Sequence, residues 1–196
     1  MNNLFTAERV SVHNLADNYL ISRHLFAYEY ATQHVKGTLL ELGCGEGYGY
    51  QLLRDQVEHY VGIDKNGTNT RNWDPQRSDF FRIRIPTLKN IPSNIFDYVV
   101  AFQVIEHIRD DKQFLTEIFR VLKKGGELIL TTPNRLRSFT RNPWHIREYT
   151  ADELGRLTRS VFPQVLVKGI NSSPQLENYL ARHKAQVEKA MRWDIF

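Results

Sequence analysis

Residues 39–50 read LLELGCGEGYGY, a short apolar run followed by a glycine at every second position from 43 to 49. A glycine-rich turn after a buried strand lets the backbone approach a ligand closely, and the usual ligand is the pyrophosphate of a dinucleotide. The dinucleotide fingerprint G-x-G-x-x-G fails here, because its third glycine is Tyr48 when counted from Gly43 and Tyr50 when counted from Gly45. The turn therefore disfavours a nicotinamide-dependent oxidoreductase, an alternative that binding of reduced nicotinamide would revive.

Two acidic residues indicate what the turn binds instead. Asp64 ends the next strand-like segment, VGID, where a carboxylate can accept hydrogen bonds from ribose hydroxyls. Glu41 precedes the turn and adds negative charge, which disfavours a phosphate and favours a ligand with a positive charge. The pattern therefore predicts a site for a cationic nucleoside without a pyrophosphate.

Strand-like and helix-like segments alternate along the chain, which indicates an α/β fold with a mostly parallel sheet. The 196 residues are most simply one domain, with an N-terminal helical cap (1–36), a cofactor-binding core (37–170) and a C-terminal helical extension (171–196). The pattern predicts strands over 38–42, 60–64, 80–85, 96–102, 127–131 and 164–170. It predicts helices over 15–34, from the glycines to about residue 55, and over 110–126, 150–161 and 175–192.

The clearest helix is DDKQFLTEIFRVLKKGG (110–126), whose apolar residues recur on one face. Acidic residues stand at its start and lysines at its end, as the helix dipole favours, and Gly125 is expected to end it. Thr150 and Glu153 form a capping box, which predicts the start of the helix over 150–161.

The composition and the apolar runs indicate where in the cell the protein is expected to work. No apolar run approaches the roughly 20 residues that span a bilayer, and the start MNNLFTAERVSVHN has no signal-peptide pattern. The single cysteine, Cys44, allows no internal disulfide, so we expect a cytoplasmic protein. The net charge of +4 is compatible with an anionic substrate or a nucleic acid and requires neither. Because Trp193–Phe196 is an apolar end, we expect that the natural chain continues or that this end docks on the body.

Four segments in order, ELGCGEGYG, VGID, FDYVVAFQVIEHI and RVLKKGGELILTTPN, resemble the class I S-adenosylmethionine-dependent methyltransferases over roughly residues 37–170. The continuation NPWHIREYTADEL is similar to a bacterial subgroup related to ubiquinone-type and to sugar- or lipid-modifying methyltransferases. The resemblance implies a Rossmann-like, doubly wound sheet with helices on both faces. It also implies S-adenosyl-L-methionine as the cofactor, bound across the carboxyl ends of the strands, and S-adenosyl-L-homocysteine as the product.

The resemblance and the chemistry of the residues assign the same roles around the turn. Gly43 and Gly45 let the backbone lie against the methionine part of the cofactor. Glu41 is expected to face the ammonium or sulfonium group, and Asp64 is expected to accept from the ribose hydroxyls.

Further cofactor contacts are expected at neighbouring positions. Gln103, after the fourth strand, is placed near the methionine moiety, and Tyr28 is expected to close over its amino acid end. Many family members carry an acid after the third strand that reads the adenine amino group. Arg84 stands at that place here, so we expect adenine to be held by backbone and apolar groups. The remaining expected contacts are Cys44, Tyr48, Lys65 and Ile83.

Two segments depart from the pattern of the family. The stretch between Asp64 and Phe80 is short and polar, so we expect a loop in place of a helix. The family normally closes its sheet with a β-hairpin, of which only the first strand, 164–170, is predicted. We therefore expect the C-terminal hairpin to be incomplete.

Two histidines are the candidates for catalysis. Methyl transfer from a sulfonium is an in-line displacement, and a hydroxyl or ammonium nucleophile must also lose a proton to a base. His107, in VIEHI, and His145, in NPWHIREY, both follow the carboxyl ends of predicted strands. A structural hydrogen bond at a helix start explains His107 equally well, whereas His145 lies in a polar, aromatic-rich loop of the kind that carries function.

Glu106, His107 and His145 resemble part of a pattern, E-x-x-E-H with a later histidine, that some relatives, including small-RNA 2′-O-methyltransferases, use to bind a divalent ion. Gln103 stands where that pattern has its first acid, but one carboxylate and two imidazoles could still hold a metal with open positions. Sequence spacing does not determine the geometry of such a set. The sequence therefore favours a site without a metal.

The expected activity is transfer of a methyl group to an oxygen or nitrogen atom of a small, sugar- or lipid-linked acceptor. The loop 135–147 is compatible with a lid over an anionic acceptor or RNA, although a solvated basic loop explains it slightly better. An RNA methyltransferase with a steep salt dependence and a non-catalytic nucleoside-binding module remain as alternatives. The loop contains Arg135, Arg137, Arg141 and Arg147, with Phe139 and Trp144 between them.

Overall fold

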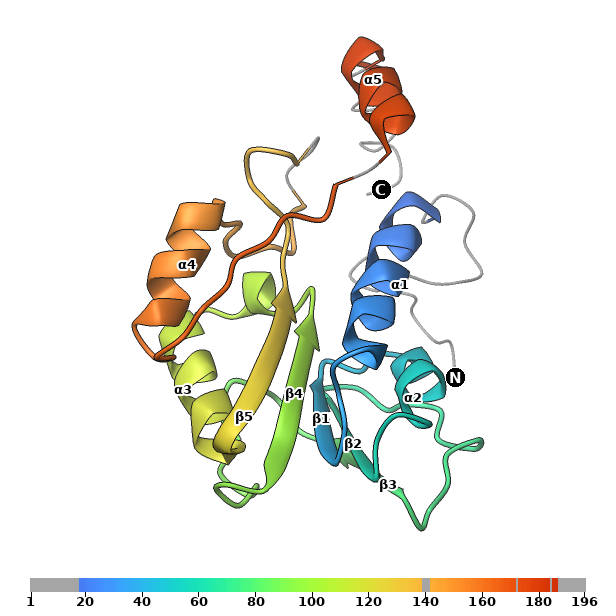
Figure 1. Ribbon diagram of the computed structural model, residues 1–196, viewed down its shortest axis with the longest axis vertical. Coiled ribbons are helices and arrows are strands. Elements are labelled where there is room, and N and C mark those ends of the chain that lie inside the picture. Colours follow the sequence, from blue (N-terminus) through green and yellow to red (C-terminus); the bar gives the residue numbers. More distant parts are fainter. Residues whose placement is uncertain (1–17, 139–141, 172, 184, 187–196) are drawn as a thin grey trace.

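Five parallel strands form one sheet in the order β3-β2-β1-β4-β5 (Figure 1). The computed structural model describes residues 18–138, 142–171, 173–183 and 185–186. Every neighbouring pair of strands is parallel. The predicted Rossmann-like α/β fold is therefore confirmed. The strands are β1 Thr38–Leu42, β2 His59–Asp64, β3 Ser78–Arg82, β4 Phe96–Phe102 and β5 Leu122–Thr131.

Helices cover both faces of the sheet (Figure 1). One face carries α1 and α2, and the other face carries α3 and α4. Nowhere in the described part of the chain is a helix long and apolar enough to cross a membrane. The helices are α1 Asn18–Thr32, α2 Tyr48–Leu53, α3 Asp111–Val121, α4 Ala151–Arg159 and α5 Pro174–Arg182, the last of which lies beyond the carboxyl ends of the strands in Figure 1.

The core lies in two layers because successive side chains of a strand point to opposite faces. On β1, Leu39 packs with Ala27 of α1 and Tyr50 of α2. Its neighbour Leu40 packs in the other layer, with Phe114 of α3. The central strands are apolar on both sides, which agrees with the near-continuous apolar character of their sequences.

The topology places the glycine turn at a crevice. β1 pairs with β2 on one side and with β4 on the other, so the direction of strand succession reverses between β1 and β4. Connections from two such strands leave toward opposite faces, which opens a crevice at their carboxyl ends. The glycine turn follows β1, and the segment 103–107 follows β4. The two segments therefore lie at the same end of the molecule.

The boundaries of two predicted elements were wrong. α3 ends at Val121, and Leu122 already belongs to β5, where it pairs with Phe96. Leu122 fits the apolar face of a helix and a buried strand equally well, so helical periodicity alone extended the helix too far. β3 covers Ser78–Arg82 and not 80–85. The predicted capping box at the start of α4 is present, with Thr150 accepting from the backbone of Glu153 and Glu153 accepting from that of Thr150.

The predicted sixth strand is absent from the described residues. Residues 164–170 run past α4 without strand pairing, and the sheet ends at β5 (Figure 1). Leu166 in this run is 77% exposed, whereas Val165 and Val167 are half-buried, so one side of the run packs on the protein although no strand pairs with it. The helix predicted over 175–192 is α5, which covers Pro174–Arg182. Residues 1–17 and 187–196, including the apolar end Trp193–Phe196, lie outside the described residues.

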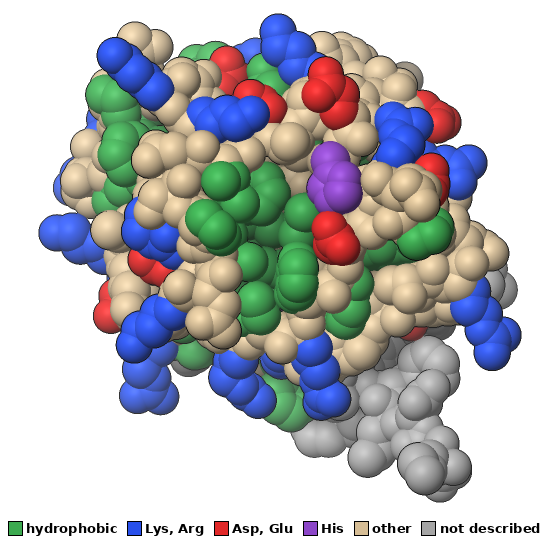
Figure 2. Space-filling view, turned by 90° about the horizontal axis from the view of Figure 1, so that it is seen from below, with side chains coloured by type: hydrophobic (Ala, Val, Ile, Leu, Met, Phe, Trp, Pro, Cys, Tyr) green, Lys and Arg blue, Asp and Glu red, His purple; other side chains and the backbone are tan. Residues whose placement is uncertain are grey.

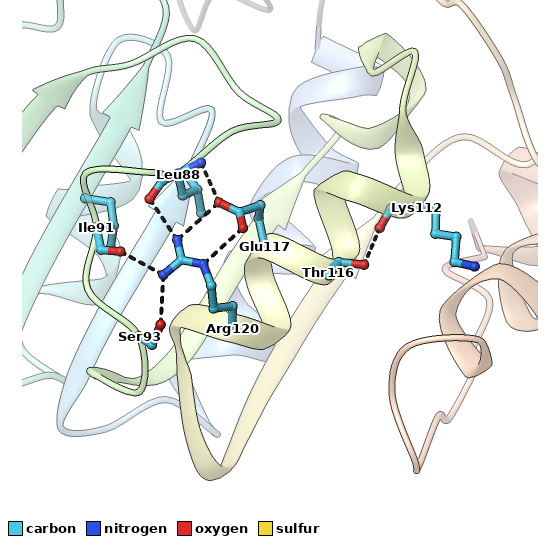
Figure 3. Close-up of polar contacts among 7 residues, drawn as sticks. All are labelled: Leu88, Ile91, Ser93, Lys112, Thr116, Glu117 and Arg120. Atoms are coloured by element: carbon cyan, nitrogen blue, oxygen red, sulfur yellow. Dashed lines mark hydrogen bonds and ion pairs between the residues drawn. The ribbon is translucent and has the colours of Figure 1, made fainter.

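Loops replace the helices that a doubly wound sheet usually carries around its third strand. Residues 65–77 contain turns and no helix, as predicted, and residues 83–95 cross from β3 to β4 in the same way. Arg120 of α3 holds the second loop (Figure 3). Its guanidinium donates to the carbonyls of Leu88 and Ile91 at 2.8 and 2.9 Å, to Ser93 Oγ at 3.0 Å and to both carboxylate oxygens of Glu117. Glu117 in turn accepts from the Leu88 amide at 2.8 Å.

This loop borders a hollow of about 520 Å³ at the amino ends of the strands. Seen from below, hydrophobic side chains gather in a hollow of the surface (Figure 2). The hollow extends along β3 from the amino ends of the strands as far as Ile83, which follows the carboxyl end of β3. Its lining includes Thr38, His59, Asp79, Phe81 and Ile95.

Replacing Arg120 with Ala tests the role of this contact. The change removes charge-assisted hydrogen bonds and leaves the partly buried Glu117 carboxylate without its cation. We expect a loss of about 2 kcal/mol in the free energy of unfolding, measured by urea denaturation. Lys112→Ala, at an exposed position of the same helix, is the control and should change the free energy by less than about 0.5 kcal/mol. Equal effects of the two variants would show that the Arg120 contacts are not what holds the loop.

Candidate functional site

The turn after β1 requires glycine at three positions. Gly43, Gly45 and Gly47 have φ angles of 74°, 56° and 84°, a region that side chains with a Cβ rarely adopt. A Cβ on Gly43 would lie 2.6 Å from Cγ2 of Val104, whereas a Cβ on Gly45 would meet no protein atom within 4 Å. Gly43 therefore packs against the segment after β4, and Gly45 borders open space.

Asp64 anchors the same turn from the end of β2. Its Oδ2 accepts from the amide of Gly45 at 3.0 Å, and its Oδ1 accepts from the amide of Asn66 at 2.8 Å. Its carbonyl accepts from the amide of Ile83 at 3.0 Å, which draws the end of β3 to this point. Ile83 is half-buried, and Lys65 is exposed. The predicted ribose and adenine residues thus lie together beside the turn.

Glu41 lies beneath the turn and makes its hydrogen bonds within the protein. Its side chain is buried, and its two carboxylate oxygens accept from the hydroxyls of Tyr28 and Tyr60. Burial raises the pKa of Glu41, and burial also raises the pKa of both tyrosines. The contacts of Glu41 and Tyr28 with the cofactor stay predictions, and in this structure the two side chains bond to each other. Both side chains support the turn from below.

The other predicted residues of the turn are packed against the protein. Cys44 is buried, its Sγ lies 3.7 Å from Oγ1 of Thr68, and burial raises the pKa of its thiol. A thiol held in its neutral form is a poor nucleophile, so the Cys44 side chain packs in the turn and does not act as a nucleophile. The Tyr48 hydroxyl lies 3.0 Å from Nδ1 of His24 on α1.

Gln103 follows β4 and has a backbone conformation that is rare for a residue with a side chain. Its φ is 56°, its amide donates to the carbonyl of Thr131 at 3.0 Å, and its Nε2 donates to the Thr131 hydroxyl at 3.0 Å. Strained backbone of this kind concentrates at functional sites. The strain turns the chain sharply after β4 and leads into the residues that follow.

Glu106, His107 and His145 come together beyond the ends of β4 and β5. Glu106 and His107 lie in the short 3₁₀ helix η2, Ile105–His107, and His145 lies in the segment after β5. One side-chain ligand atom from each of the three lies within 4.8 Å of the others. The carbonyl of Glu106 accepts from the amides of Ile146 and Arg147 at 2.8 and 3.2 Å, which fixes the two segments to each other.

The hydrogen bonds of this cluster leave one buried atom unsatisfied. Nδ1 of His107 lies 3.0 Å from the carbonyl of Trp144, and Nδ1 of His145 lies 2.7 Å from Oε1 of Glu148. Oε2 of Glu106 accepts from the hydroxyl of Thr132 at 2.8 Å, and its Oε1 has no hydrogen-bond partner among the residues that the structure describes. Burial raises the pKa of Glu106 to about 8.

Sequence reasoning missed two supporting residues of the cluster, Thr132 and Glu148. Glu148 also accepts from the hydroxyl of Ser138 at 2.6 Å, so it ties His145 to the start of the loop. The sequence offered one indication for Glu148, namely its position three residues after His145. The role of Thr132 could not be predicted in this way, because it depends on the pairing of β4 with β5.

The basic residues of the loop 135–147 largely contact the protein itself. Arg135 donates to Glu153 at 3.0 Å, and Arg147 donates to Asp111 at 2.9 Å. Arg84 is exposed, at the end of β3. Arg141 and Phe139 lie outside the described residues. The paired arginines agree better with a structural loop than with a lid over an anion.

Comparisons with known proteins agree with this geometry. A family model described as a methyltransferase domain matches residues 13–162. A probable S-adenosylmethionine-dependent methyltransferase of Mycolicibacterium smegmatis is 34% identical over 206 aligned positions, which cover 96% of this chain and 80% of the relative. The human mitochondrial ubiquinone biosynthesis O-methyltransferase is 33% identical over 106 positions, which cover 50% of this chain and 29% of that enzyme.

Among solved structures, a Burkholderia thailandensis 1,6-didemethyltoxoflavin-N1-methyltransferase with bound S-adenosylhomocysteine superimposes with a TM-score of 0.57. It is 18% identical, and the match covers 75% of each chain, so this likeness shows the fold alone. The family match over most of the chain and the M. smegmatis relative show more: this chain belongs to the class I S-adenosylmethionine-dependent methyltransferases.

Proposed function

We propose that this methyltransferase acts on an oxygen or nitrogen atom of a small, sugar- or lipid-linked acceptor bound over the carboxyl ends of β4 and β5. The observation that carries the proposal is the convergence of Glu106, His107 and His145 at that place. Groups that can hold or accept a proton are needed where a hydroxyl or ammonium becomes the nucleophile. The cluster follows β4, next to the crevice that the glycine turn borders.

The residues around the turn fit S-adenosylmethionine, which supplies an electrophilic methyl group on its sulfonium when bound. The open space at Gly45 allows a ligand to lie against the backbone. Asp64 accepts from the backbone amides of Gly45 and Asn66, and a carboxylate can accept several hydrogen bonds at once. We assign the ribose hydroxyls to the same carboxylate because it lies at the end of β2 beside the turn.

We assign the remaining residues to parts of the cofactor from their positions in the fold. Gln103 lies at the methionine end, since it follows the strand next to β1. Ile83 supplies an apolar contact for adenine at the end of β3, with Arg84 beside it. The backbone of Cys44, the ring of Tyr48 and the backbone of Lys65 complete the surroundings of the cofactor, while Glu41 and Tyr28 support them from below.

On the acceptor side, His145 is the better placed base. Its Nδ1 contacts the carboxylate of Glu148, which orients the ring and stabilises the charged imidazole formed when Nε2 accepts a proton. His107 lies beside it, with a distance of 4.9 Å between the ring centroids, and it positions the same end of the acceptor. The enzyme then needs to align the acceptor atom, the methyl group and the sulfur, and to exclude water.

The surface near His145 favours an acceptor with an apolar part. Trp144 and Ile146, the two neighbours of His145 in the chain, are 51% and 50% exposed. Leu136, in the same loop, is 77% exposed. Exposed apolar side chains near a binding site bury well against an acyl or isoprenoid chain. The pairing of Arg135 and Arg147 with carboxylates makes RNA the less favoured acceptor.

Gly45→Ala tests the cofactor position, and Gly125→Ala is its matched control. Both glycines have positive φ, and a Cβ at either position meets no protein atom within 4 Å, but Gly125 lies in β5 outside the crevice. Each change should cost about 1–2 kcal/mol of stability through backbone strain. We expect only Gly45→Ala to weaken S-adenosylmethionine binding, by at least about tenfold in calorimetric titration. Equal affinities of the two variants would place the cofactor elsewhere.

Asp64→Ala tests the ribose contact. The variant loses the acceptors for ribose and for the Gly45 amide, so we expect the cofactor affinity to fall by about tenfold or more. Asp79→Ala is the control, because Asp79 lies on the neighbouring strand and pairs with His59 at 2.8 Å outside the crevice. Thermal unfolding of both variants separates loss of binding from loss of fold. An unchanged dissociation constant in Asp64→Ala would contradict the assignment.

The acceptor is tested with labelled S-adenosylmethionine and cell extract separated into lipid, small-molecule and RNA fractions. We expect label in the lipid or small-molecule fraction. We also expect His145→Ala to lower the rate by about 100-fold or more with little change in cofactor affinity. His59→Ala, whose ring pairs with Asp79 at the other end of the strands, should retain the rate. Label that enters RNA, or full activity in His145→Ala, would overturn the proposal.

A further inference from the structure

We infer that Thr68 is a positioning residue for the cofactor, because its hydroxyl holds the Gly45 peptide in the conformation that faces S-adenosylmethionine. Thr68 lies in the loop between β2 and β3. It acts through the glycine turn and has no need to touch the reacting atoms. The inference rests on the cofactor position proposed above, and it goes further by naming the residue that prepares the turn for the cofactor.

The side chain of Thr68 contacts two glycines of the turn. Its Oγ1 donates to the carbonyl of Gly45 at 2.7 Å. A Cβ on Gly47 would lie 2.7 Å from Cγ2 of Thr68, so the methyl group already fills the space beside Gly47. The hydroxyl and the methyl group of one side chain therefore hold the turn at two positions.

Gly45 is held on both sides of its Cα atom. Its amide donates to Oδ2 of Asp64 at 3.0 Å, and its carbonyl accepts from Thr68. These two groups belong to the two peptide planes that rotate about φ and ψ of Gly45. Glycine loses more conformational freedom on ordering than any other residue, and a Cβ on Gly45 would meet no protein atom within 4 Å. The two hydrogen bonds thus order a residue that its own packing leaves free.

The neighbouring thiol restrains the same hydroxyl. Sγ of Cys44 lies 3.7 Å from Oγ1 of Thr68. A hydroxyl has one proton to donate, and the proton of Thr68 is directed to the Gly45 carbonyl. Burial raises the pKa of the Cys44 thiol, so the thiol keeps its proton and can donate it weakly to Oγ1. The hydroxyl therefore has protein groups on both its donor and its acceptor side.

The loop that carries Thr68 is tied to the protein before and after this residue. Before it, the amide of Asn66 donates to Asp64 at 2.8 Å. After it, the ring of Trp73 is buried and stacks on Tyr50 of α2, with 4.8 Å between the ring centroids. These two anchors bring the middle of the loop against the glycine turn.

Burial within the loop distinguishes Thr68 from its neighbours. Residues 65–67 and 69–72 are exposed, whereas Thr68 is half-buried. The loop takes the place of the helix that a doubly wound sheet usually carries after its second strand. The one side chain of this stretch that points inward is therefore the one that bonds to the turn.

A turn that is ordered before the cofactor arrives binds it more tightly, because ordering a loop on binding reduces affinity. Without the Thr68 hydroxyl, the Gly45 carbonyl loses its donor and the peptide that follows Gly45 can rotate. Part of the binding free energy is then used to restore the turn. The effect concerns the adenosine and amino acid parts of the ligand, which S-adenosylmethionine and S-adenosylhomocysteine share.

Thr68→Val tests the inference, because valine keeps the shape and the methyl contact of threonine and removes the hydroxyl. We expect calorimetric titration to give dissociation constants about three- to tenfold higher for both S-adenosylmethionine and S-adenosylhomocysteine. Thr68→Ser retains the hydroxyl and should restore binding of both ligands to within about twofold of the unaltered protein.

Thr116→Val is the matched control. The hydroxyl of Thr116 also donates to a backbone carbonyl, that of Lys112 at 2.8 Å, but it lies on α3, which covers the other face of the sheet (Figure 3). This variant should bind both ligands as the unaltered protein does. Thermal unfolding shows whether each variant is folded. If Thr68→Val fails to fold, Thr68→Ala compared with Thr68→Ser isolates the same hydroxyl.

Unchanged affinity in Thr68→Val, or equal weakening in Thr68→Val and Thr68→Ser, would overturn the inference, since the hydroxyl is then not what positions the turn. Failure of the proposed cofactor position gives a different result, because Gly45→Ala and Asp64→Ala would then leave the affinity unchanged as well. If those two variants weaken binding and Thr68→Val does not, the cofactor position holds and only the role of Thr68 is wrong.

Discussion

The buried carboxylate of Glu41 joins the parts of the structure on which the cofactor site depends. It belongs to β1, it accepts from Tyr28 of α1 and from Tyr60 of β2, and it is almost completely buried. A buried carboxylate must have its hydrogen bonds satisfied, so these three elements cannot shift independently. Gly49 of α2 packs directly over the carboxylate, where a Cβ would not fit. The glycine turn between β1 and α2 is therefore held at both ends.

The ends of β2, β3 and β4 all lie close to this turn. Asp64 at the end of β2 accepts from the Gly45 amide, and the amide of Ile83 after β3 donates to the Asp64 carbonyl. On the other side, Val104 after β4 packs against Gly43. The carboxyl ends of four neighbouring strands thus meet around one short loop. This is the physical reason why a parallel sheet of this order concentrates ligand-binding groups at one edge.

The same edge continues into the cluster of Glu106, His107 and His145. The sharp turn at Gln103 and the hydrogen bonds from Ile146 and Arg147 to the carbonyl of Glu106 bring two distant segments together. The cluster combines two features. They are a buried carboxylate with an unsatisfied oxygen, and two imidazoles whose Nδ1 atoms face acceptors. Its position beside the cofactor crevice is why we assign the acceptor to it.

The sequence predicted the elements whose signals are local. The apolar runs of β1, β2 and β4, the stripe of α3 and the capping box of α4 all depend on residues within one or two turns of each other. The failed dinucleotide spacing and the acid that ends β2 predicted the type of site, because glycine conformation and the strand end are also local properties. The family resemblance then named the cofactor, which the comparisons support.

The tertiary structure decided what depends on distant partners. Leu122 became the start of β5 because Phe96 is its neighbour, and 164–170 formed no strand because β5 offers it no pairing. Glu41 turned inward because two tyrosine hydroxyls from other elements reach it, which its position before the turn could not reveal. The pairing of β4 with β5, together with the loop that follows β5, brings Glu106 and His145 close to each other. By itself the sequence determined the apolar periodicity of the elements and the conformation of the glycine turn. The tertiary structure decided which polar groups form hydrogen bonds with one another, because the partners of a buried carboxylate are close in the fold but distant in the sequence.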